Sequence, residues 1–378
     1  MKVKRMIALL LALWLGLCAL PCPRARAAGP FTDVPEHAYY RKPVLWAYEE
    51  KITAGTSSTT FSPKSKLSFA EIATFLYRYA YSPTAHYTQP ALARWRGQYY
   101  YTPLSWCCDF GLIAPAQVSG ANHPKNKLTR NDFVEILYRY ATLWEKRPAD
   151  FEADCLAPYA DAPAEAEARR AWSWAVSAGI VRGTAAHSLS PQKQLNRAEF
   201  VTMLYRFETQ AEPLRGEALM GRRLRGWQRT LLEAGELAWG APWVDEAYVL
   251  GADGIPTVID CSGIVNWVFR YTGLRPYEDM DCAPLWASGI FPHVFEKSAG
   301  ENGLAFFLRC QEQLLPGDLL LLHSANSGYH IMIYLGATAS ELYVFHARQG
   351  KGVCAEAIPI SESSGYITKQ IGVMRYIP

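Results

Sequence analysis

One cysteine stands where an irregular segment gives way to a helical pattern. The sequence Ile-Asp-Cys-Ser-Gly runs from Ile259 to Gly263, and the apolar residues that follow it recur on one face of a predicted helix. A cysteine at a helix N-terminus lies near the positive end of the helix dipole and near free backbone N–H groups. Both favour the thiolate, which is the nucleophilic form of the side chain. We therefore predict that Cys261 is a nucleophile; a buried structural cysteine is the alternative that this stretch alone leaves open.

Histidines that can act as a base follow on predicted strands. Apolar runs at residues 319–322, 330–336 and 342–347 are separated by Gly and Asn turns, which predicts an antiparallel sheet behind the helix. The second run begins with His330 and the third contains His346. A cysteine on a helix with histidines on strands is the arrangement of papain-like hydrolases.

Several sequence blocks in this part of the chain resemble the NlpC family of cell-wall cysteine peptidases. The resemblance covers about residues 236–378. It implies a papain-like α+β domain that hydrolyses an amide in the stem peptide of peptidoglycan, typically between D-glutamate and the diamino acid. The matching blocks are Tyr-Val-x-Gly at residues 248–251, Asp-Cys-Ser-Gly at 260–263, Leu-x-Pro-Gly-Asp at 314–318, His-x-x-Ile-Tyr-Leu-Gly at 330–336 and His-Ala at 346–347.

The same resemblance implies roles for individual residues. Cys261 matches the nucleophile, and His330 matches the general base that takes its proton and returns it to the leaving amine. His346 matches the third polar group, which orients His330. Backbone N–H groups at the helix start would hold the oxyanion. The positions that line the substrate cleft are matched by Tyr248, Asp260 and Ser262.

The sequence departs from that family in several places. Ala247 replaces a usual proline and Ala252 replaces the second of two paired glycines, which affects the substrate subsites more than catalysis. His293 and His323 compete for the role of the base. His323 ends an apolar strand where the family has an aromatic residue, so we predict a structural role for it. Asp260 is a candidate partner for a positively charged amine of the stem peptide.

The N-terminal half contains an internal repeat with a period of about 60–68 residues. Ten-residue segments that begin at Trp46, Trp106 and Trp174 align, and each unit continues into a predicted helix that ends in a Leu-Tyr-Arg-aromatic tetrad. A unit of this size cannot bury its apolar stripe alone, so we expect the three to pack together. The predicted N-caps of these helices are Ser68, Thr129 and Asn196.

These units resemble S-layer homology repeats over about residues 29–208. The matching features are the Phe-Thr-Asp-Val-Pro opening at 31–35, the Trp-to-Gly block and the Thr/Asn-Arg-Ala/Asn-Glu/Asp block at the helix start. The resemblance implies a pseudo-threefold helical bundle whose grooves bind an anionic secondary polymer of the Gram-positive cell wall, often with pyruvylated sugars. In that family the arginine of the last block contacts the anion, and a guanidinium fork suits a carboxylate.

Matched residue by residue, the predicted polymer-binding set contains Arg130 and Arg197 as anion contacts, together with Asp33 and Asp161 of the opening motif. The first repeat has Phe69 where the arginine belongs, and the second lacks the Asp-Val opening. We therefore expect at most two competent grooves. The alternative is that the arginines are solvated charges at helix starts.

Residues 1–28 are typical of a secretory signal peptide. A basic start precedes an apolar run, and an Ala-Arg-Ala site follows at 25–27; an uncleaved membrane anchor is the alternative. Without this segment the net charge is about −2, which gives no support for nucleic-acid binding. Export permits disulfides, and the seven remaining cysteines are an odd number, so at least one stays free or pairs with another molecule.

The sequence therefore predicts a multidomain protein, with an all-α pseudo-threefold bundle of three repeats and a C-terminal α+β papain-like domain. The predicted function is that of a secreted, cell-wall-anchored peptidoglycan hydrolase, a cysteine endopeptidase whose partners are stem peptides and the secondary polymer. An N-acetylmuramoyl-L-alanine amidase or acyl-transfer enzyme on the same fold, and a non-catalytic wall-binding protein, remain alternatives.

We expect no metal, organic cofactor, nucleic acid or membrane span in the mature protein. The predicted boundaries are 1–28 for the signal, 29–81, 90–145 and 155–208 for the repeats, 209–235 for a linker or solvated first helix, and 236–378 for the peptidase domain.

Overall fold

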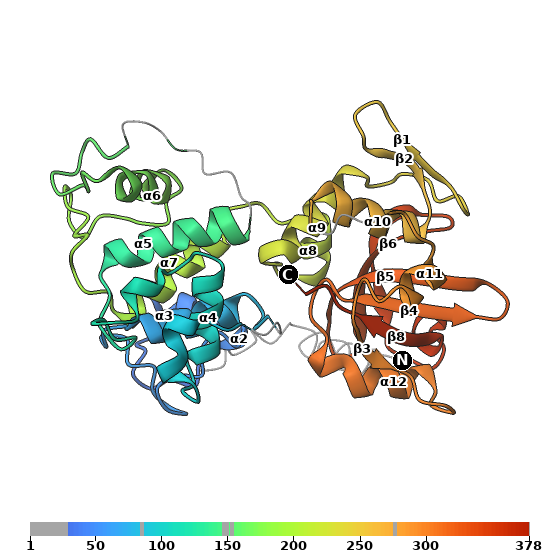
Figure 1. The fold of residues 1–378 in the computed structure, drawn as a ribbon, viewed down its shortest axis with the longest axis horizontal. Coiled ribbons are helices and arrows are strands. Elements are labelled where there is room, and N and C mark those ends of the chain that lie inside the picture. The colour runs from blue at the N-terminus through green and yellow to red at the C-terminus, as the bar shows by residue number, and fades with distance from the viewer. Residues whose placement is uncertain (1–28, 84–86, 146–150, 152–154, 275–277, 378) are drawn as a thin grey trace, which may run out of the picture.

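In the computed structural model, the chain forms a helical N-terminal part and a C-terminal part built on a β-sheet (Figure 1). The predicted signal peptide lies outside the residues that the structure describes. Among those residues, no helix combines the length and the apolar character needed to cross a bilayer. The described residues are 29–83, 87–145, 151, 155–274 and 278–377.

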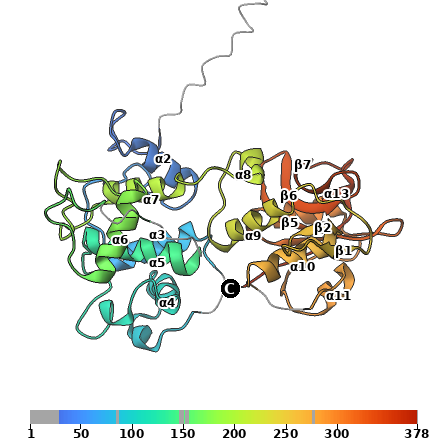
Figure 2. The ribbon, with the colours of Figure 1, turned by 90° about the horizontal axis from the view of Figure 1, so that it is seen from above.

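The helices of the N-terminal part gather on one side of the molecule in two perpendicular views (Figures 1 and 2). Short 3-10 turns at Pro90–Trp95 and Pro115–Gln117 and a π-helical turn at Tyr140–Trp144 accompany them. The α-helices are α2 (Arg41–Glu49), α3 (Phe69–Tyr79), α4 (Tyr101–Asp109), α5 (Arg130–Arg139), α6 (Ala166–Ser177) and α7 (Arg197–Glu208).

The helices α3, α5 and α7 begin where the sequence predicts. Their N-caps are Ser68, Thr129 and Asn196, and each cap side chain accepts a hydrogen bond from the backbone N–H three residues on. The acidic side chain at that third position bonds back to the cap, which completes a capping box in all three helices. In α5 this returning carboxylate belongs to Asp132.

A closed ring of backbone hydrogen bonds joins the segments that precede these three helices. The N–H of Leu67 donates to the carbonyl of Leu195 at 3.0 Å, the N–H of Leu195 to Leu128 at 3.1 Å, and the N–H of Leu128 to Leu67 at 3.2 Å. Phenylalanines of α3 and α5 each pack against Phe200 of α7 with ring centroids 5.0 Å apart. The three segments therefore share one core, as expected of units too small to bury an apolar stripe alone.

The C-terminal part is built on an antiparallel sheet with the strand order β3-β8-β4-β5-β6-β7. A hairpin of β1 (Tyr248–Leu250) and β2 (Pro256–Ile259) leads into helix α10 (Cys261–Tyr271). The predicted antiparallel sheet behind a helix is thus confirmed. The strands of the sheet are β3 (His293–Glu296), β4 (Leu319–Ser324), β5 (Gly328–Ala337), β6 (Glu341–Arg348), β7 (Gly352–Pro359) and β8 (Gln370–Met374), and the remaining helices are α11 (Cys282–Ala287), α12 (Gly303–Cys310) and α13 (Gly365–Thr368).

The two faces of this sheet bury different helices, because successive side chains of a strand point to opposite sides. In β4, Leu319 and Leu321 belong to the core that includes α10, whereas Leu320 and Leu322 belong to the core that includes α12. A strand that is buried on both faces reads as a continuous apolar run, which explains the sequence pattern here. The sheet thereby holds α10 against β5 and β6, with Cys261 at the start of the helix.

Two helices, α8 (Arg215–Met220) and α9 (Gly226–Leu237), connect the two parts of the chain (Figure 2). Helix α8 packs against β6 and β7, and α9 packs against α10. The predicted helical character of this linker is confirmed. Its predicted solvation is wrong for Arg229, which is buried and pairs with the buried carboxylate of Glu217 at 2.7 Å.

A buried ion cluster ties this linker to the helical part. The side chain of Arg225 is 1% exposed, and it bonds to Glu208 of α7 at 3.1 Å and to Glu50, which follows α2, at 2.7 Å. Tyr79 of α3 donates its hydroxyl to the other oxygen of Glu208 at 2.6 Å. The guanidinium is buried because carboxylates from two neighbouring elements replace its contacts with water.

Candidate active site

Cys261 is the first residue of α10, as the sequence predicts. Asp260 is the N-cap, and its carboxylate accepts hydrogen bonds from the N–H of Gly263 at 2.6 Å and from the hydroxyl of Ser262 at 3.0 Å. These bonds explain why the helix begins here. Glycine is needed at the third helical position, because a Cβ atom on Gly263 would lie only 2.8 Å from the side chain of Ile259.

A line of polar side chains on neighbouring strands leads away from the cysteine. The Nε2 atom of His330 on β5 lies 2.9 Å from Nδ1 of His346 on β6. The Nε2 atom of His346 lies 3.1 Å from the carboxylate of Glu356 on β7. The structure thus brings the two predicted histidines together. It adds Glu356, which the sequence reasoning missed, although a lone acid in the otherwise apolar strand Gly352–Pro359 was an available signal.

The surroundings of Cys261 favour its thiolate. Its sulfur lies 3.7 Å from the sulfur of Cys282, the first residue of α11. The hydrogen bond from Cys282 lowers the pKa of Cys261, His330 and the backbone N–H of Ile331 act in the same direction, and together they outweigh the opposing effect of burial. The same pairing, together with burial, raises the pKa of Cys282. Cys261 is therefore the thiolate of the pair, and its proximity to His330 fits the predicted nucleophile and base.

An open cleft of about 450 Å³ gives access to Cys261. His330 and Tyr366 line the same cleft. Its other lining residues include two cations, Lys369 and Arg348, of which Arg348 pairs with Glu356, and one acid, Asp245.

The predicted substrate-binding residues gather in a second hollow, of about 380 Å³, beside the start of α10. The hydroxyl of Tyr248 accepts a hydrogen bond from Arg270 at 2.8 Å, which orients the ring. This hollow is strongly acidic. The predicted residues that line it are Tyr248, Asp260 and Ser262, and the further acidic residues are Glu246, Asp279 and Asp281.

The two competing histidines lie outside the line that joins Cys261, His330 and His346. His323 is exposed, lines the cleft and has its ring 4.4 Å from the ring of Tyr329. The structural role predicted for His323 does not fit this exposed position, because β4 leaves the buried part of the sheet at this residue. The ring of His293 bonds to the carbonyl of Trp286 at 2.8 Å.

Arg130 and Arg197 occupy corresponding positions at the starts of α5 and α7. Arg130 donates from Nε to the carbonyl of Leu189 at 3.0 Å, and Arg197 donates from Nε to the carbonyl of Phe61 at 2.8 Å. Both side chains are buried, so the alternative of solvated helix-start charges is wrong. Arg130 also lines a hollow of about 310 Å³, whose other basic residues are Arg182, Lys193 and Arg206.

Asp33 and Asp161 organise the loops that carry these carbonyl groups. The carboxylate of Asp33 accepts hydrogen bonds from the N–H groups of Phe61 and the next residue at 2.8 and 2.7 Å. The carboxylate of Asp161 accepts them from Leu189 and the next residue at 2.8 and 2.9 Å. The structure therefore places both aspartates behind the arginines as supports of the loops, with their oxygens turned to backbone N–H groups.

Within the described ranges, His346, Cys354 and Glu356 bring three potential metal-ligand atoms within 4.8 Å of one another. The carboxylate of Glu356 also pairs with Arg348 and Lys351. Because these two cations already neutralise the carboxylate, the cluster fits an ion-pair network better than a metal site. The expectation that the protein needs no metal stays a prediction.

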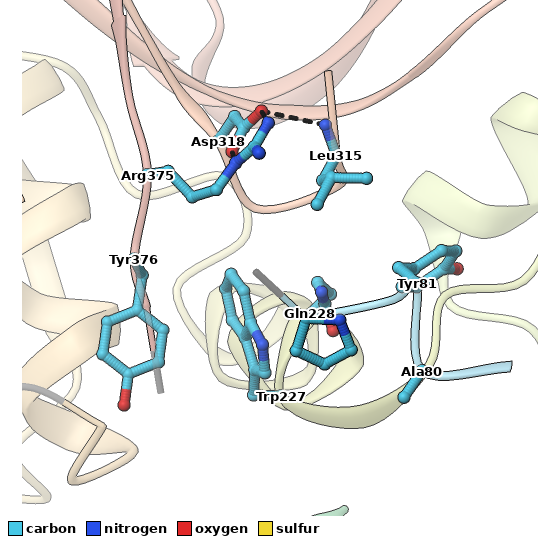
Figure 3. Close-up of a pocket in the computed structure, with 9 residues that line it drawn as sticks. Ala80, Tyr81, Trp227, Gln228, Leu315, Asp318, Arg375 and Tyr376 are labelled. Carbon is cyan, nitrogen blue, oxygen red and sulfur yellow. Dashed lines mark hydrogen bonds and ion pairs between the residues drawn. The ribbon is translucent and has the colours of Figure 1, made fainter. Parts of the chain in front are cut away.

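A small cavity of about 20 Å³ lies where α9 meets the C-terminal sheet (Figure 3). Trp227 and Tyr376 line it. Asp318, which also lines it, accepts a hydrogen bond from the N–H of Leu315 at 2.8 Å and pairs with Arg375 at 2.7 Å. The volume suits a single water molecule and no substrate. The Leu-x-Pro-Gly-Asp block is therefore a structural turn that Arg375 holds in place.

Models of two protein families match parts of the chain. The model for the S-layer homology domain matches residues 30–73 and 158–201, and the model for the NlpC/P60 family matches residues 245–371. No curated protein matches the chain. The predicted second repeat, residues 90–145, lies outside these matches, so the count of three repeats stays a prediction. S-layer homology domains indicate association with the cell surface. The chain thus contains S-layer homology domains followed by a C-terminal domain of the NlpC/P60 family of cysteine peptidases.

Proposed function

We propose that this protein is a secreted, cell-wall-anchored peptidoglycan hydrolase, a cysteine endopeptidase that cleaves the stem peptide between D-glutamate and the diamino acid. The observation that carries the proposal is the arrangement of Cys261, His330 and His346 beside an open cleft in an NlpC/P60 domain. A thiolate with a histidine base and a third polar group is the arrangement that amide hydrolysis by a cysteine nucleophile requires.

In this proposal the reaction passes through a thioester. The thiolate of Cys261 attacks the carbonyl carbon of the scissile amide, and N–H groups at the start of α10 hold the oxyanion. His330 donates a proton to the leaving amine, which departs and leaves the acyl-enzyme. His330 then takes a proton from the water that attacks the thioester, and the thiolate is restored. His346 keeps the ring of His330 in place throughout.

The charges on the two sides of Cys261 favour one orientation of the substrate. The acidic hollow that contains Asp260 and Tyr248 suits a free amine at the start of the stem peptide. In the cleft on the other side, Lys369 suits the carboxylates carried by the diamino acid and the residues after it. A peptide that places its amine in the first and its carboxylates in the second would present the intervening amide to the nucleophile.

The proposed anchor is a pseudo-threefold bundle of three S-layer homology repeats. The ring of hydrogen bonds among Leu67, Leu128 and Leu195 and the shared capping boxes support the inclusion of the second repeat. The hollow beside Arg130 is basic, which suits an anionic polymer of a Gram-positive cell wall. Arg197 occupies the position at the start of α7 that corresponds to Arg130. The carbonyl group that each arginine contacts belongs to a loop that an aspartate holds.

The test is mass spectrometry of purified muropeptides after incubation with the protein, with Cys261→Ala as the control. The expected result is a new pair of products from cleavage between D-glutamate and the diamino acid, absent in the control. Release of the whole stem peptide from the sugar would replace the proposal with an amidase. No cleavage by folded, reduced protein would leave a wall-binding protein and would refute the enzymatic proposal.

A further inference from the structure

A carboxylate on β7 stands behind the histidine pair. His346, whose side chain is fully buried, lies with its Nε2 atom 3.1 Å from one oxygen of Glu356. The other oxygen accepts a hydrogen bond from Arg348 at 2.9 Å and pairs with Lys351. Burial raises the pKa of Glu356, but the hydrogen bonds from His346, Lys351 and Arg348 outweigh it, and the net pKa lies well below its usual range. Glu356 is therefore an ionised group that only accepts hydrogen bonds.

An ionised acceptor determines which nitrogen of His346 carries a proton. Because Glu356 cannot donate, the proton must stand on Nε2 of His346. Burial lowers the pKa of His346, so the ring is neutral and Nδ1 carries a lone pair. This Nδ1 then accepts a hydrogen bond from Nε2–H of His330 at 2.9 Å. The Nδ1 atom of His330 is thereby left without a proton and is free to exchange one with Cys261.

We propose that Glu356 is a positioning residue, which acts through His346 to keep His330 in the tautomer that serves as the base and to stabilise its imidazolium form. This inference rests on the proposed function of the Cys261 site. The titratable and charged groups that face His346 are His330 from β5, Arg348 from β6, Cys354 and Glu356 from β7, and Tyr366 from α13.

The test compares Glu356→Ala and Glu356→Gln with the wild type by two readouts across pH. One is muropeptide cleavage, and the other is the rate at which iodoacetamide alkylates Cys261, followed on the peptide that contains it. In Glu356→Ala we expect kcat to fall by about 10- to 100-fold with little change in KM, which is the loss known for outer hydrogen-bond partners that orient a metal-binding histidine. The alkylation midpoint should move to higher pH, because a less stable imidazolium stabilises the thiolate less. Both readouts of Glu356→Gln should lie between those of the wild type and Glu356→Ala, because the amide oxygen still accepts a hydrogen bond from His346.

The matched control is Lys351→Ala, which removes an exposed partner of Glu356 and leaves the contact with His346 intact.

Unchanged kcat and an unchanged alkylation midpoint in both Glu356 variants would overturn this assignment. If thermal unfolding shows that the alanine variant does not fold, the glutamine variant alone decides. A shifted alkylation midpoint in a protein that cleaves no muropeptide would support the positioning role and reject the proposed peptidase function, so the two failures are distinguishable.

Cys261 also has a second cysteine beside it, Cys282, whose contact does not involve Glu356. The sulfur atoms of Cys261 and Cys282 lie 3.7 Å apart, each at the first residue of a helix. Cys261 lines the open cleft, so small molecules reach it. Burial raises the pKa values of Cys107, Cys108, Cys310 and Cys354. Cys261, the cysteine that is poised as a thiolate, thus has a second thiol in contact.

This geometry permits a balanced thiol–disulfide exchange. The thiolate of Cys261 attacks one sulfur of a small disulfide RSSR, forms a mixed disulfide and releases RS⁻. Cys282 then loses its proton to water or buffer, attacks the sulfur of Cys261 and releases the second RS⁻. Two protein thiols are oxidised to one disulfide, and RSSR is reduced to two thiols. The sulfurs need to move from 3.7 Å to a bonded distance of about 2.0 Å.

We infer that Cys282 is a resolving thiol, so that low-molecular-weight disulfides convert the pair reversibly into a Cys261–Cys282 disulfide. This bond removes the nucleophile from the cleft, and it keeps Cys261 from the higher oxidation states that thiols do not reverse. The bond forms whether or not the protein is a peptidase, so the inference does not depend on the proposed function.

The probe is glutathione disulfide, added to the reduced protein and followed by peptide mapping in a mass spectrometer. We expect a cross-linked pair of peptides that contain Cys261 and Cys282, lighter by two hydrogens and restored by dithiothreitol. In Cys282→Ser we expect a persistent glutathione adduct on Cys261. Cys310→Ser, which removes a thiol on the opposite face of the sheet, should behave as the wild type. A persistent adduct on Cys261 in the wild type, or a link from Cys261 to another cysteine, would refute the resolving role.

Discussion

Replacing Arg225 by methionine should destabilise the helical part far more than removing its neighbour Arg222. Arg225 bonds to two carboxylates, those of Glu208 and Glu50. Methionine keeps much of the side-chain volume and removes the charge. Arg222→Met is a matched control, because Arg222 bonds to the same Glu50 at 2.9 Å but is 42% exposed.

The magnitude follows from what each carboxylate retains. Glu208 is 4% exposed and would lose the guanidinium of Arg225, while it keeps the hydroxyl of Tyr79. Glu50 keeps Arg222. Breaking a buried pair costs about 3–5 kcal/mol, and the retained hydrogen bond places the expected loss near the lower end, at about 3 kcal/mol. The exposed pair of Arg222 should contribute less than about 1 kcal/mol.

The assay is equilibrium unfolding in urea, followed by tryptophan fluorescence, for the two single variants and for Arg225→Met combined with Glu208→Gln. The double variant no longer contains an unpaired buried charge, so it should be more stable than Arg225→Met alone. A loss below about 1 kcal/mol in Arg225→Met, or a double variant less stable than the single one, would refute the reasoning that an uncompensated Glu208 dominates.

The same cluster predicts a pH dependence with a definite sign. Burial raises the pKa of Glu50, but Arg225 and Arg222 outweigh it and the net pKa is lowered from 4.5. A carboxyl group whose pKa is lowered in the folded state stabilises the fold fully when the pH is above its pKa in the unfolded chain. That stabilisation is lost as the pH falls through the lowered pKa of the folded state. The urea midpoint of the wild type should therefore decrease as the pH falls below 4.5, and this decrease should be smaller in Arg225→Met.

Other predictions concern the functional surfaces. The hydrogen bond from Cys282 is the largest of the effects that lower the pKa of Cys261, so Cys261 is a thiolate at both pH ~6 and pH ~8. Iodoacetamide should therefore label it about equally fast at these two pH values, whereas labelling of an ordinary thiol slows about tenfold per pH unit. A proportional slowing at Cys261 would contradict this prediction. Arg130→Ala should weaken binding to purified cell walls by about tenfold or more, as measured by co-sedimentation, because it removes a charge-assisted contact. Exposed Lys64→Ala is its control, and equal binding by both variants would count against the groove. Asp260→Ala should lower the thermal midpoint, since it removes an N-cap worth about 1 kcal/mol. Asp260→Asn should retain the cap, so an equal loss in both would show that capping is not the reason.

Several features of this protein follow from local sequence alone. The N-caps at Ser68, Thr129 and Asn196 are readable because a cap and its returning acid lie within four consecutive residues. The strands of the C-terminal sheet are readable because alternation and apolar runs report burial of one or both faces. The sequence also predicts that a helix begins at Cys261, because its cap Asp260 and the apolar stripe that follows are immediate neighbours in the sequence.

The tertiary structure decided what stands beside these residues. Cys282 comes 21 positions after Cys261 in a segment without a metal or redox pattern, and only the packing of α11 near α10 brings the two sulfurs together. Glu356 reaches His346 because β7 pairs with β6 in one register, and a shift of one residue would turn the carboxylate to the other face. Arg225 reads as a solvated linker charge until two distant carboxylates enclose it. Caps and periodicities are properties of a few consecutive residues, whereas these contacts exist only after distant segments have packed.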